Sequence, residues 1–162
     1  MPYDVRSVAN LVLDFASREN TKVTNITINK IVFFLHGWYL AKNNAPLVTA
    51  KIEAWNYGPV FRELYWEFKD FGAEPITARA MRRNPATAAR EVCADKFNLA
   101  DLEFLRPLIE KYLGFSAGKL VELSHEIGAP WDQVFNHAGE SNPGMRISDE
   151  IIREFFGKQT RH

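Results

Sequence analysis

The chain has 162 residues, the length of one domain, and we expect residues 1–162 to form a single domain. Its 20 Lys and Arg balance its 20 Asp and Glu, so a net charge of zero leaves no overall field to attract nucleic acid or an anionic membrane surface. Hydrophobic residues make up 46% of the chain and aromatic residues 13%, which is enough for a core and excludes a disordered chain.

The N-terminal part of the chain predicts two helices. Asp4 is a candidate N-cap for a first helix that ends at residues 17–20. In the second helix, over residues 28–43, apolar side chains cover most of the helical circumference. A helix that is apolar on most sides must be buried, so we expect this one at the centre of the fold.

The middle of the chain predicts an extended segment, a third helix and a small hairpin. Residues 46–59 suit a short strand or an extended loop better than a helix. Pro59 is well placed as the first residue of a third helix, which Gly72 ends. Beyond it the helical period is lost, and we expect residues 76–81 to pair with residues 91–94 around an exposed loop.

The remaining part of the chain predicts helices that begin at recognisable positions. Asn98, Ser116 and Ser148 are candidate N-caps, and Pro130 opens a short helix. Together these elements predict an α+β fold that is predominantly α-helical. It has about six to seven helices around the central buried helix, together with a small β-hairpin.

Several classes of protein are excluded by what the sequence lacks. Cys93 is the only cysteine, so neither an internal disulfide nor a cysteine-rich zinc site can form. Nucleophile-elbow, Walker and dinucleotide-binding motifs are absent. The N-terminus lacks the basic region of a signal peptide, and the longest apolar run, residues 31–35, is far shorter than the ~18 residues of a membrane span. We expect a cytoplasmic protein with no membrane contact and no cofactor.

The histidines are the residues most suited to chemistry. The neighbours of His36 at helical spacing are aromatic or aliphatic, which favours a core histidine bonded to a backbone carbonyl over a buried functional base. A turn can bring His125, Glu126, Asp132 and His137 together as a metal or acid/base cluster, but their spacing matches no known ligand signature. A small hydrolase using His125 with Asp132 or Glu126 therefore stays an alternative.

Two segments are candidates for contact with a partner. The first is a loop between residues 79 and 90 that contains arginines and no acid, for which the default interpretation is a solvated loop. The second is the turn at residues 55–59, where aromatic side chains either pack on the central helix or are displayed as binding anchors. The arginines of the loop are Arg79, Arg82, Arg83 and Arg90.

Several of these segments resemble one known family. Lys30-Ile31, the run from His36 and Trp38 to Ala41, and the run from Ile52 through Trp55, Tyr57, Gly58 and Pro59 to Val60 resemble the Panacea domain, which is SocA-like and phage-associated. His125-Glu126 followed by Pro130-Trp131 looks like the second motif of that family, and residues 147–156 resemble its closing helix. The resemblance covers nearly the whole chain.

The resemblance implies an antitoxin of a two-gene toxin–antitoxin pair, often carried by mobile elements and prophages. Such a protein neutralises its cognate toxin, encoded by a neighbouring gene, by direct protein binding. The resemblance implies no catalytic residues, and it makes the family-motif residues and the arginine-containing loop candidates for partner binding. It also allows a proteolytic adaptor that delivers a bound partner to a cellular protease. A promoter-binding regulator is disfavoured, because the chain is neutral and shows no basic helix-turn-helix.

Overall fold

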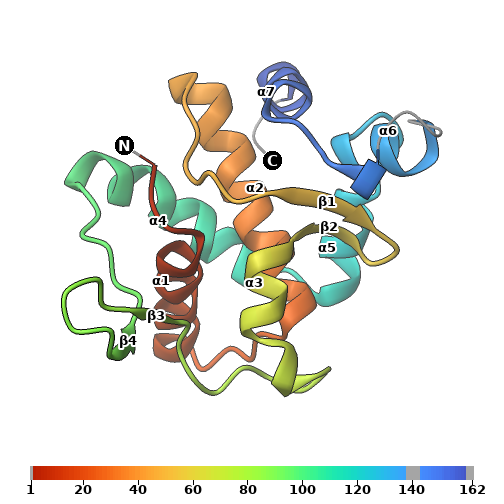
Figure 1. Ribbon diagram of the computed structural model, residues 1–162. Helices are drawn as coiled ribbons and strands as arrows, with labels where there is room; N and C mark the ends of the chain where they lie inside the picture. The colour runs from red at the N-terminus through yellow and green to blue at the C-terminus, as the bar shows by residue number, and fades with distance from the viewer. Residues whose placement is uncertain (1, 138–142, 160–162) are drawn as a thin grey trace.

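The computed structural model describes residues 2–137 and 143–159, and one helix runs through the middle of it (Figure 1). The helices are α1 (Val5–Arg18), α2 (Asn25–Asn43), α3 (Arg62–Glu67), α4 (Leu99–Leu113), α5 (Ala117–Ser124), α6 (Pro130–His137) and α7 (Asp149–Lys158), with short 3-10 turns η1 (Lys69–Phe71) and η3 (Pro143–Met145). The strands are β1 (Ile52–Trp55), β2 (Gly58–Phe61), β3 (Met81–Arg83) and β4 (Arg90–Val92). The predominantly helical α+β prediction is confirmed.

Helix α2 is the centre of the core, as its apolar circumference predicts. It packs against α1, α4, α5, α7 and β2, so nearly every side of it is covered. Helix α7 approaches it most closely, because Gly37 leaves room for the ring of Phe156: a Cβ at position 37 would lie 2.3 Å from that ring. Trp38 is buried in the same region and donates from Nε1 to the Tyr112 hydroxyl at 2.7 Å.

The N-caps expected from the sequence begin their helices. Asp4, Asn98, Ser116 and Ser148 each accept a hydrogen bond from a backbone N–H of the first turn that follows. The central helix begins at Asn25, three residues earlier than expected, because Thr24 caps it through the N–H of Thr27. Among the described residues, no helix is long and apolar enough to cross a membrane.

The strand predictions need two corrections. The segment before α3 forms a complete antiparallel hairpin, β1–β2, in which Pro59 pairs with Ala54 instead of opening the third helix. The reason is Gly58, whose φ of +112° lets the chain reverse directly after Trp55-Asn56-Tyr57, so that the helix starts only at Arg62.

The second hairpin is shifted along the chain relative to the expected one. Its register joins Met81 to Val92 and Arg83 to Arg90, so the loop covers only residues 84–89. Cys93 lies just outside β4, where its N–H donates to the Ala80 carbonyl at 2.9 Å. Figure 1 shows β1–β2 on one side of α2, and β3–β4 beyond α1 on the other side.

Candidate functional site

A buried lysine holds the turn of the β1–β2 hairpin. Lys30 of α2 is only 2% exposed, and its Nζ donates a hydrogen bond to the backbone carbonyl of Tyr57 in the turn. No carboxylate among the described residues forms an ion pair with it. A buried ammonium group without a counter-ion is costly, and burial lowers the pKa of Lys30 to about 8.

His125 lies against the same turn. Its Nε2 is buried and has no hydrogen-bond partner within the described part of the chain. Burial lowers the pKa of His125, and the nearby charge of Lys30 lowers that pKa further, while the Tyr57 carbonyl acts in the opposite direction. Two polar groups, one cationic and one unsatisfied, therefore meet beneath the turn without an acid between them.

Gly58 closes this cluster. A Cβ built on Gly58 would lie 3.2 Å from His125 Nε2, and 3.3 Å from Lys30 Cε and from Ser124 Oγ. Since the positive φ of Gly58 is also unfavourable for a side chain, both conformation and space require glycine here. The two segments that resemble one family, around Trp55-Pro59 and around His125-Trp131, are thus brought into contact.

A column of stacked rings fastens α6 to the hairpin. The ring of His125 lies 3.8 Å from Trp131, with 5° between their planes, and Trp131 stacks in turn on Phe135 at 4.6 Å. The indole N–H of Trp131 donates to the carbonyl of Trp55 at 2.7 Å. Trp131 and Pro130 are both buried, so they serve to position the turn.

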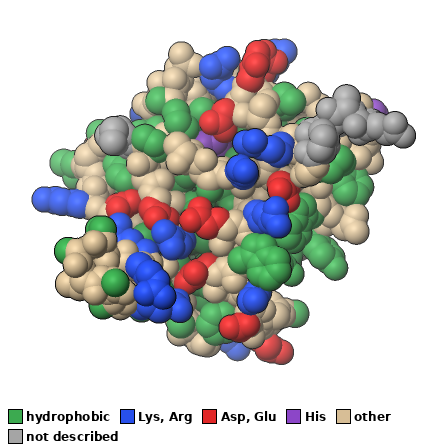
Figure 2. Space-filling view, viewed as in Figure 1, with side chains coloured by type: hydrophobic (Ala, Val, Ile, Leu, Met, Phe, Trp, Pro, Cys, Tyr) green, Lys and Arg blue, Asp and Glu red, His purple; other side chains and the backbone are tan. Residues whose placement is uncertain are grey.

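Aromatic side chains remain on the outer side of the hairpin and of α3. Tyr57 is 60% exposed and Trp66 is 51% exposed, whereas Trp55 and Tyr65 are partly buried. Trp55 meets Tyr65 edge to face with ring centroids 4.9 Å apart, and Tyr65 meets Trp66 at 6.4 Å. Figure 2 shows hydrophobic side chains exposed beside charged ones on one face of the molecule. We call Trp55, Tyr57, Tyr65 and Trp66 the aromatic face.

His36 lies in the core, but its partners differ from the expected backbone carbonyl. Its Nε2 lies 2.8 Å from the carboxylate of Asp149 in the first turn of α7, while the N–H of Val48 points at Nδ1 from 3.5 Å. The difference follows from α7, which packs on α2 and brings its acidic first turn over this position. Because His36 is 1% exposed, it connects structural elements and offers no surface to a partner.

The arginines of the 79–90 segment are mostly paired with acids from other parts of the chain. Arg79 Nε lies 2.9 Å from Asp14, and Arg82 lies within 3.5 Å of Glu91 and Asp95. Although the segment itself contains no acid, acidic side chains from other parts of the chain therefore lie beside its arginines. Arg90 lies 3.9 Å from Glu67, and Arg83 donates to the Ala88 carbonyl at 3.1 Å.

Within the described residues, His125 forms no hydrogen bond or ion pair with Asp132 or Glu126, the two carboxylates suggested as its partners, whereas His137 Nε2 lies 3.6 Å from Asp132. Both oxygens of Asp132 are occupied, one by the N–H of Gly128 at 2.9 Å and the other by the Asn136 amide at 2.7 Å. The same two hydrogen bonds, in that order, lower the pKa of Asp132. No hydrogen bond joins Asp132 to His125 within residues 2–137 and 143–159, and those residues contain no cluster of three metal-ligating side chains.

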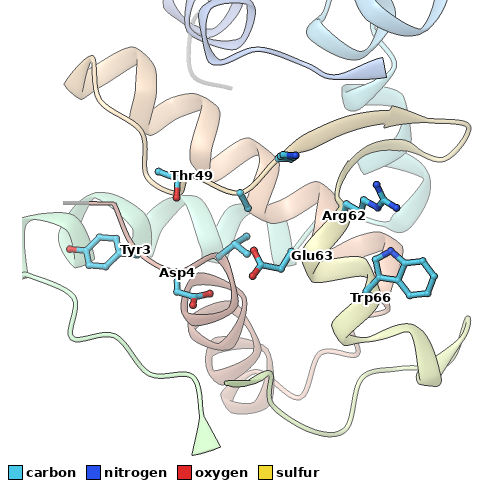
Figure 3. Close-up of a pocket in the computed structure, with 9 residues that line it drawn as sticks. Tyr3, Asp4, Thr49, Arg62, Glu63 and Trp66 are labelled. Carbon is cyan, nitrogen blue, oxygen red and sulfur yellow. The ribbon is translucent and has the colours of Figure 1, made fainter. Parts of the chain in front are cut away.

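A cleft of about 640 Å³ opens beside the aromatic face, between α3, the start of α1 and the chain that leads into β1. Figure 3 shows Tyr3 toward one end of the cleft, Arg62 and Trp66 toward the other, and Glu63 between them. Sequence reasoning missed this cleft, because three segments distant in the sequence build it. Lys30 was noted in the sequence only as part of the family resemblance and was given no role in the site, although a lysine among the buried positions of an apolar helix is a usable signal.

Comparisons with known proteins cover the whole site. A family model described as antitoxin SocA-like, Panacea domain, matches residues 28–132, which include Lys30, the hairpin turn and Trp131. The chain is 32% identical over 154 residues to Antitoxin SocA of Caulobacter vibrioides (strain NA1000 / CB15N), a match covering 94% of this chain and 82% of that relative. No solved structure matches the chain significantly.

Proposed function

The chain belongs to the antitoxin SocA-like, Panacea domain family, and we propose on this premise that it is a cytoplasmic antitoxin that neutralises a protein toxin by binding it directly. The observation that carries the proposal is the 32% identity to Antitoxin SocA over 94% of the chain. Family membership supports an antitoxin role. The partner is the cognate toxin, encoded by a neighbouring gene.

The aromatic face is the surface on which we place the toxin. Tyr and Trp are enriched among the few residues that supply most of the binding energy at protein interfaces, and holding them rigidly before binding lowers the entropy cost. Tyr57 and Trp66 are exposed, while Lys30 and Trp131 fix the backbone of the turn from below. The site therefore combines accessible rings with a backbone that has little freedom to lose.

The geometry favours binding over catalysis. A His–Asp acid/base pair needs the two side chains within hydrogen-bond reach, but the carboxylate of Asp132 is engaged by Gly128 and Asn136. His125 is stacked flat against Trp131, and its free Nε2 is buried under the turn where no substrate has access. These contacts support a non-enzymatic role.

Co-expression with the product of the neighbouring gene tests the proposal. We expect the wild-type protein to rescue growth and to co-purify with that product. The double variant Tyr57→Ala/Trp66→Ala should weaken the complex by at least about a hundredfold, as expected for two aromatic anchors. The matched control is Leu99→Ala, because Leu99 is a 71% exposed apolar residue at the start of α4.

Two results would contradict the proposal. If growth is not rescued and no complex forms, the antitoxin function is wrong. If Leu99→Ala weakens the complex as much as the double variant does, the aromatic face is not the binding surface. The half-life of the toxin separates direct neutralisation from delivery to a protease: a toxin that is bound but stable supports neutralisation, whereas one degraded faster in the presence of this protein indicates an adaptor.

A further inference from the structure

Glu53 is an acid on the outer side of the first hairpin that is mostly shielded from water. The residues of β1 alternate, with Ile52 and Ala54 buried, so Glu53 and Trp55 share the opposite side of the strand. The side chain of Glu53 is nevertheless only 13% exposed. Turn η3 packs against β1 (Figure 1), and a Cβ built on Gly144 in this turn would lie 3.9 Å from Glu53 Oε2. A carboxylate in such a place needs hydrogen-bond donors.

The indole of Trp55 supplies such a donor. Trp55 Nε1 donates a hydrogen bond to Glu53 Oε1 at 2.8 Å, while Arg62 Nη1 lies 4.0 Å from Oε2. A hydrogen bond to an ionised carboxylate that is largely removed from water is stronger than one between neutral groups. Because the acceptor belongs to the same strand, this contact fixes the orientation of the indole relative to β1.

Trp55 is the first of three rings in a row on the aromatic face. It meets Tyr65 edge to face at 4.9 Å, and Tyr65 meets Trp66 at 6.4 Å. At the other end of the row, Lys69 Nζ lies 4.8 Å from the centroid of the Trp66 ring, but Lys69 is exposed, and a cation–π contact at an exposed site is weak. Glu53 is therefore the firmer attachment of this row.

We propose that Glu53 is a positioning residue of the toxin-binding surface, which acts through Trp55 by holding its indole in the orientation that the toxin contacts. This inference rests on the proposed antitoxin function, with the aromatic face as its binding surface. Lys30 and Trp131 fix the backbone of the hairpin turn, whereas Glu53 fixes a side chain. A ring that is already immobilised loses less conformational entropy when a partner binds, so Glu53 raises the affinity without having to touch the toxin.

The mobility of the Trp55 indole in the free protein provides the first test. NMR relaxation reports it, and Trp55→Phe identifies the indole signal of Trp55 among those of the four tryptophans. The order parameter of its Nε1–H should be about 0.85 in the wild type, as in rigid backbone, and should fall to about 0.6 or less in Glu53→Ala. Glu53→Gln keeps a side-chain oxygen that accepts the hydrogen bond, so the indole should stay ordered. An unchanged order parameter in Glu53→Ala overturns the proposal.

The affinity for the neighbouring gene product provides the second test, measured where urea denaturation shows each variant to be folded. Glu53→Ala should raise the dissociation constant by about three- to tenfold, the cost of ordering one side chain on binding. Glu53→Gln should raise it by less than about twofold, because the acceptor remains. In the Trp55→Phe background, Glu53→Ala should have no further effect, because the indole N–H that Glu53 holds is absent.

The matched control is Glu103→Ala, which removes an exposed acid on α4 outside the aromatic face. The positioning role is overturned, while the antitoxin function stands, if Glu53→Ala binds as tightly as the wild type or if Glu103→Ala weakens binding equally. The same holds if Glu53→Ala weakens binding as much in Trp55→Phe as in the wild type, or no more than Glu53→Gln does. If the wild type forms no complex, the proposed function fails, and the role of Glu53 in binding fails with it.

Discussion

The two hairpins of this protein are held in opposite ways. All four residues of β2 are buried, and α2 holds the hairpin from below. Lys30 donates a hydrogen bond to the carbonyl of Tyr57 in the turn, and Asn29 Oδ1 accepts a hydrogen bond from the N–H of Phe61 at 2.9 Å. The strands of β3–β4 lie at the surface, and buried side chains of α1 hold the base of this hairpin. Asn10 accepts a hydrogen bond from the N–H of Ala80 at 2.8 Å, and Ser7 Oγ lies 3.2 Å from Cys93 Sγ.

The difference lies in which side chains each hairpin leaves available. Most charges in and beside the second hairpin are paired: Arg79 and Arg82 find acids in α1, in β4 and at Asp95, while Arg83 donates to the Ala88 carbonyl. The first hairpin instead leaves an aromatic side chain available. It has a rigid, buried base and an exposed Tyr57 at the tip. Rigid support with free aromatic rings is typical of a binding surface, whereas neutralised arginines are typical of a solvated one.

The largest effect on the first hairpin is expected from a substitution of Gly58. Gly58→Ala introduces a side chain at a φ of +112° and within 3.3 Å of Lys30 and His125, so we expect the unfolding free energy to fall by about 2–5 kcal/mol. Urea denaturation measures this loss. The matched control is Gly157→Ala, where nothing lies within 4 Å in α7, and stability should rise by about 0.5–1 kcal/mol. Equal effects of the two substitutions would show that Gly58 is not special.

Lys30→Met tests whether the base of the first hairpin serves binding or stability. Removing a buried charge that has no counter-ion should raise the unfolding free energy at pH 7 by about 1–3 kcal/mol, although the turn loses its hydrogen bond to Lys30. Toxin binding should weaken, because Tyr57 is then less firmly placed. A variant that is less stable than the wild type would show that the fold itself needs this charge.

The difference in stability between the wild type and Lys30→Met should also depend on pH. The pKa of Lys30 falls from 10.5 to about 8 on folding, so the unfolded chain binds this proton more tightly than the folded chain does. The penalty is complete below pH 8 and is relieved as the pH rises toward 10.5. The wild type should therefore approach the stability of Lys30→Met over this window. A constant difference between the two proteins from pH 7 to pH 10.5 would contradict the lowered pKa.

The smallest effect is expected in the second hairpin. Arg82→Gln removes ion pairs with Glu91 and Asp95 near the surface, so the unfolding free energy should fall by no more than about 1 kcal/mol, and less at high salt. Isothermal titration calorimetry should show unchanged affinity for the toxin. A marked loss of affinity at unchanged stability would assign partner contact to the arginines and remove the contrast between the two hairpins.

Sequence reasoning succeeded where structure is decided locally. Caps such as Asn98 and Ser116 act on the turn that follows them, and the apolar residues on nearly all sides of α2 predict that this helix is buried. The prediction that Pro59 opens the third helix was wrong, because proline suits both the first turn of a helix and a strand position that needs no N–H. Position 58 decided between them, since only glycine adopts the backbone angle of this tight reversal with ease.

The site itself was only partly predictable. Trp55, Tyr57 and Trp131 were identified through their resemblance to a family, but Lys30 and Tyr57 lie 27 residues apart, and nothing local joins them. The pairing of Arg79 with Asp14 spans 65 residues. Ion pairs of this kind depend on how distant elements pack, so a charge count within one segment cannot reveal them.

The close packing of α7 on α2 also bears on how the chain folds during synthesis. Phe156 sits directly on Gly37, and the carboxylate of Asp149 is the partner of the buried His36. Until residues 149–158 have been made, a nascent chain exposes this apolar side of its central helix, and exposed surface of this kind favours aggregation or capture by chaperones. The last helix described here thus completes the core, and shortened chains that end before Asp149 are expected to be substrates of cellular quality control.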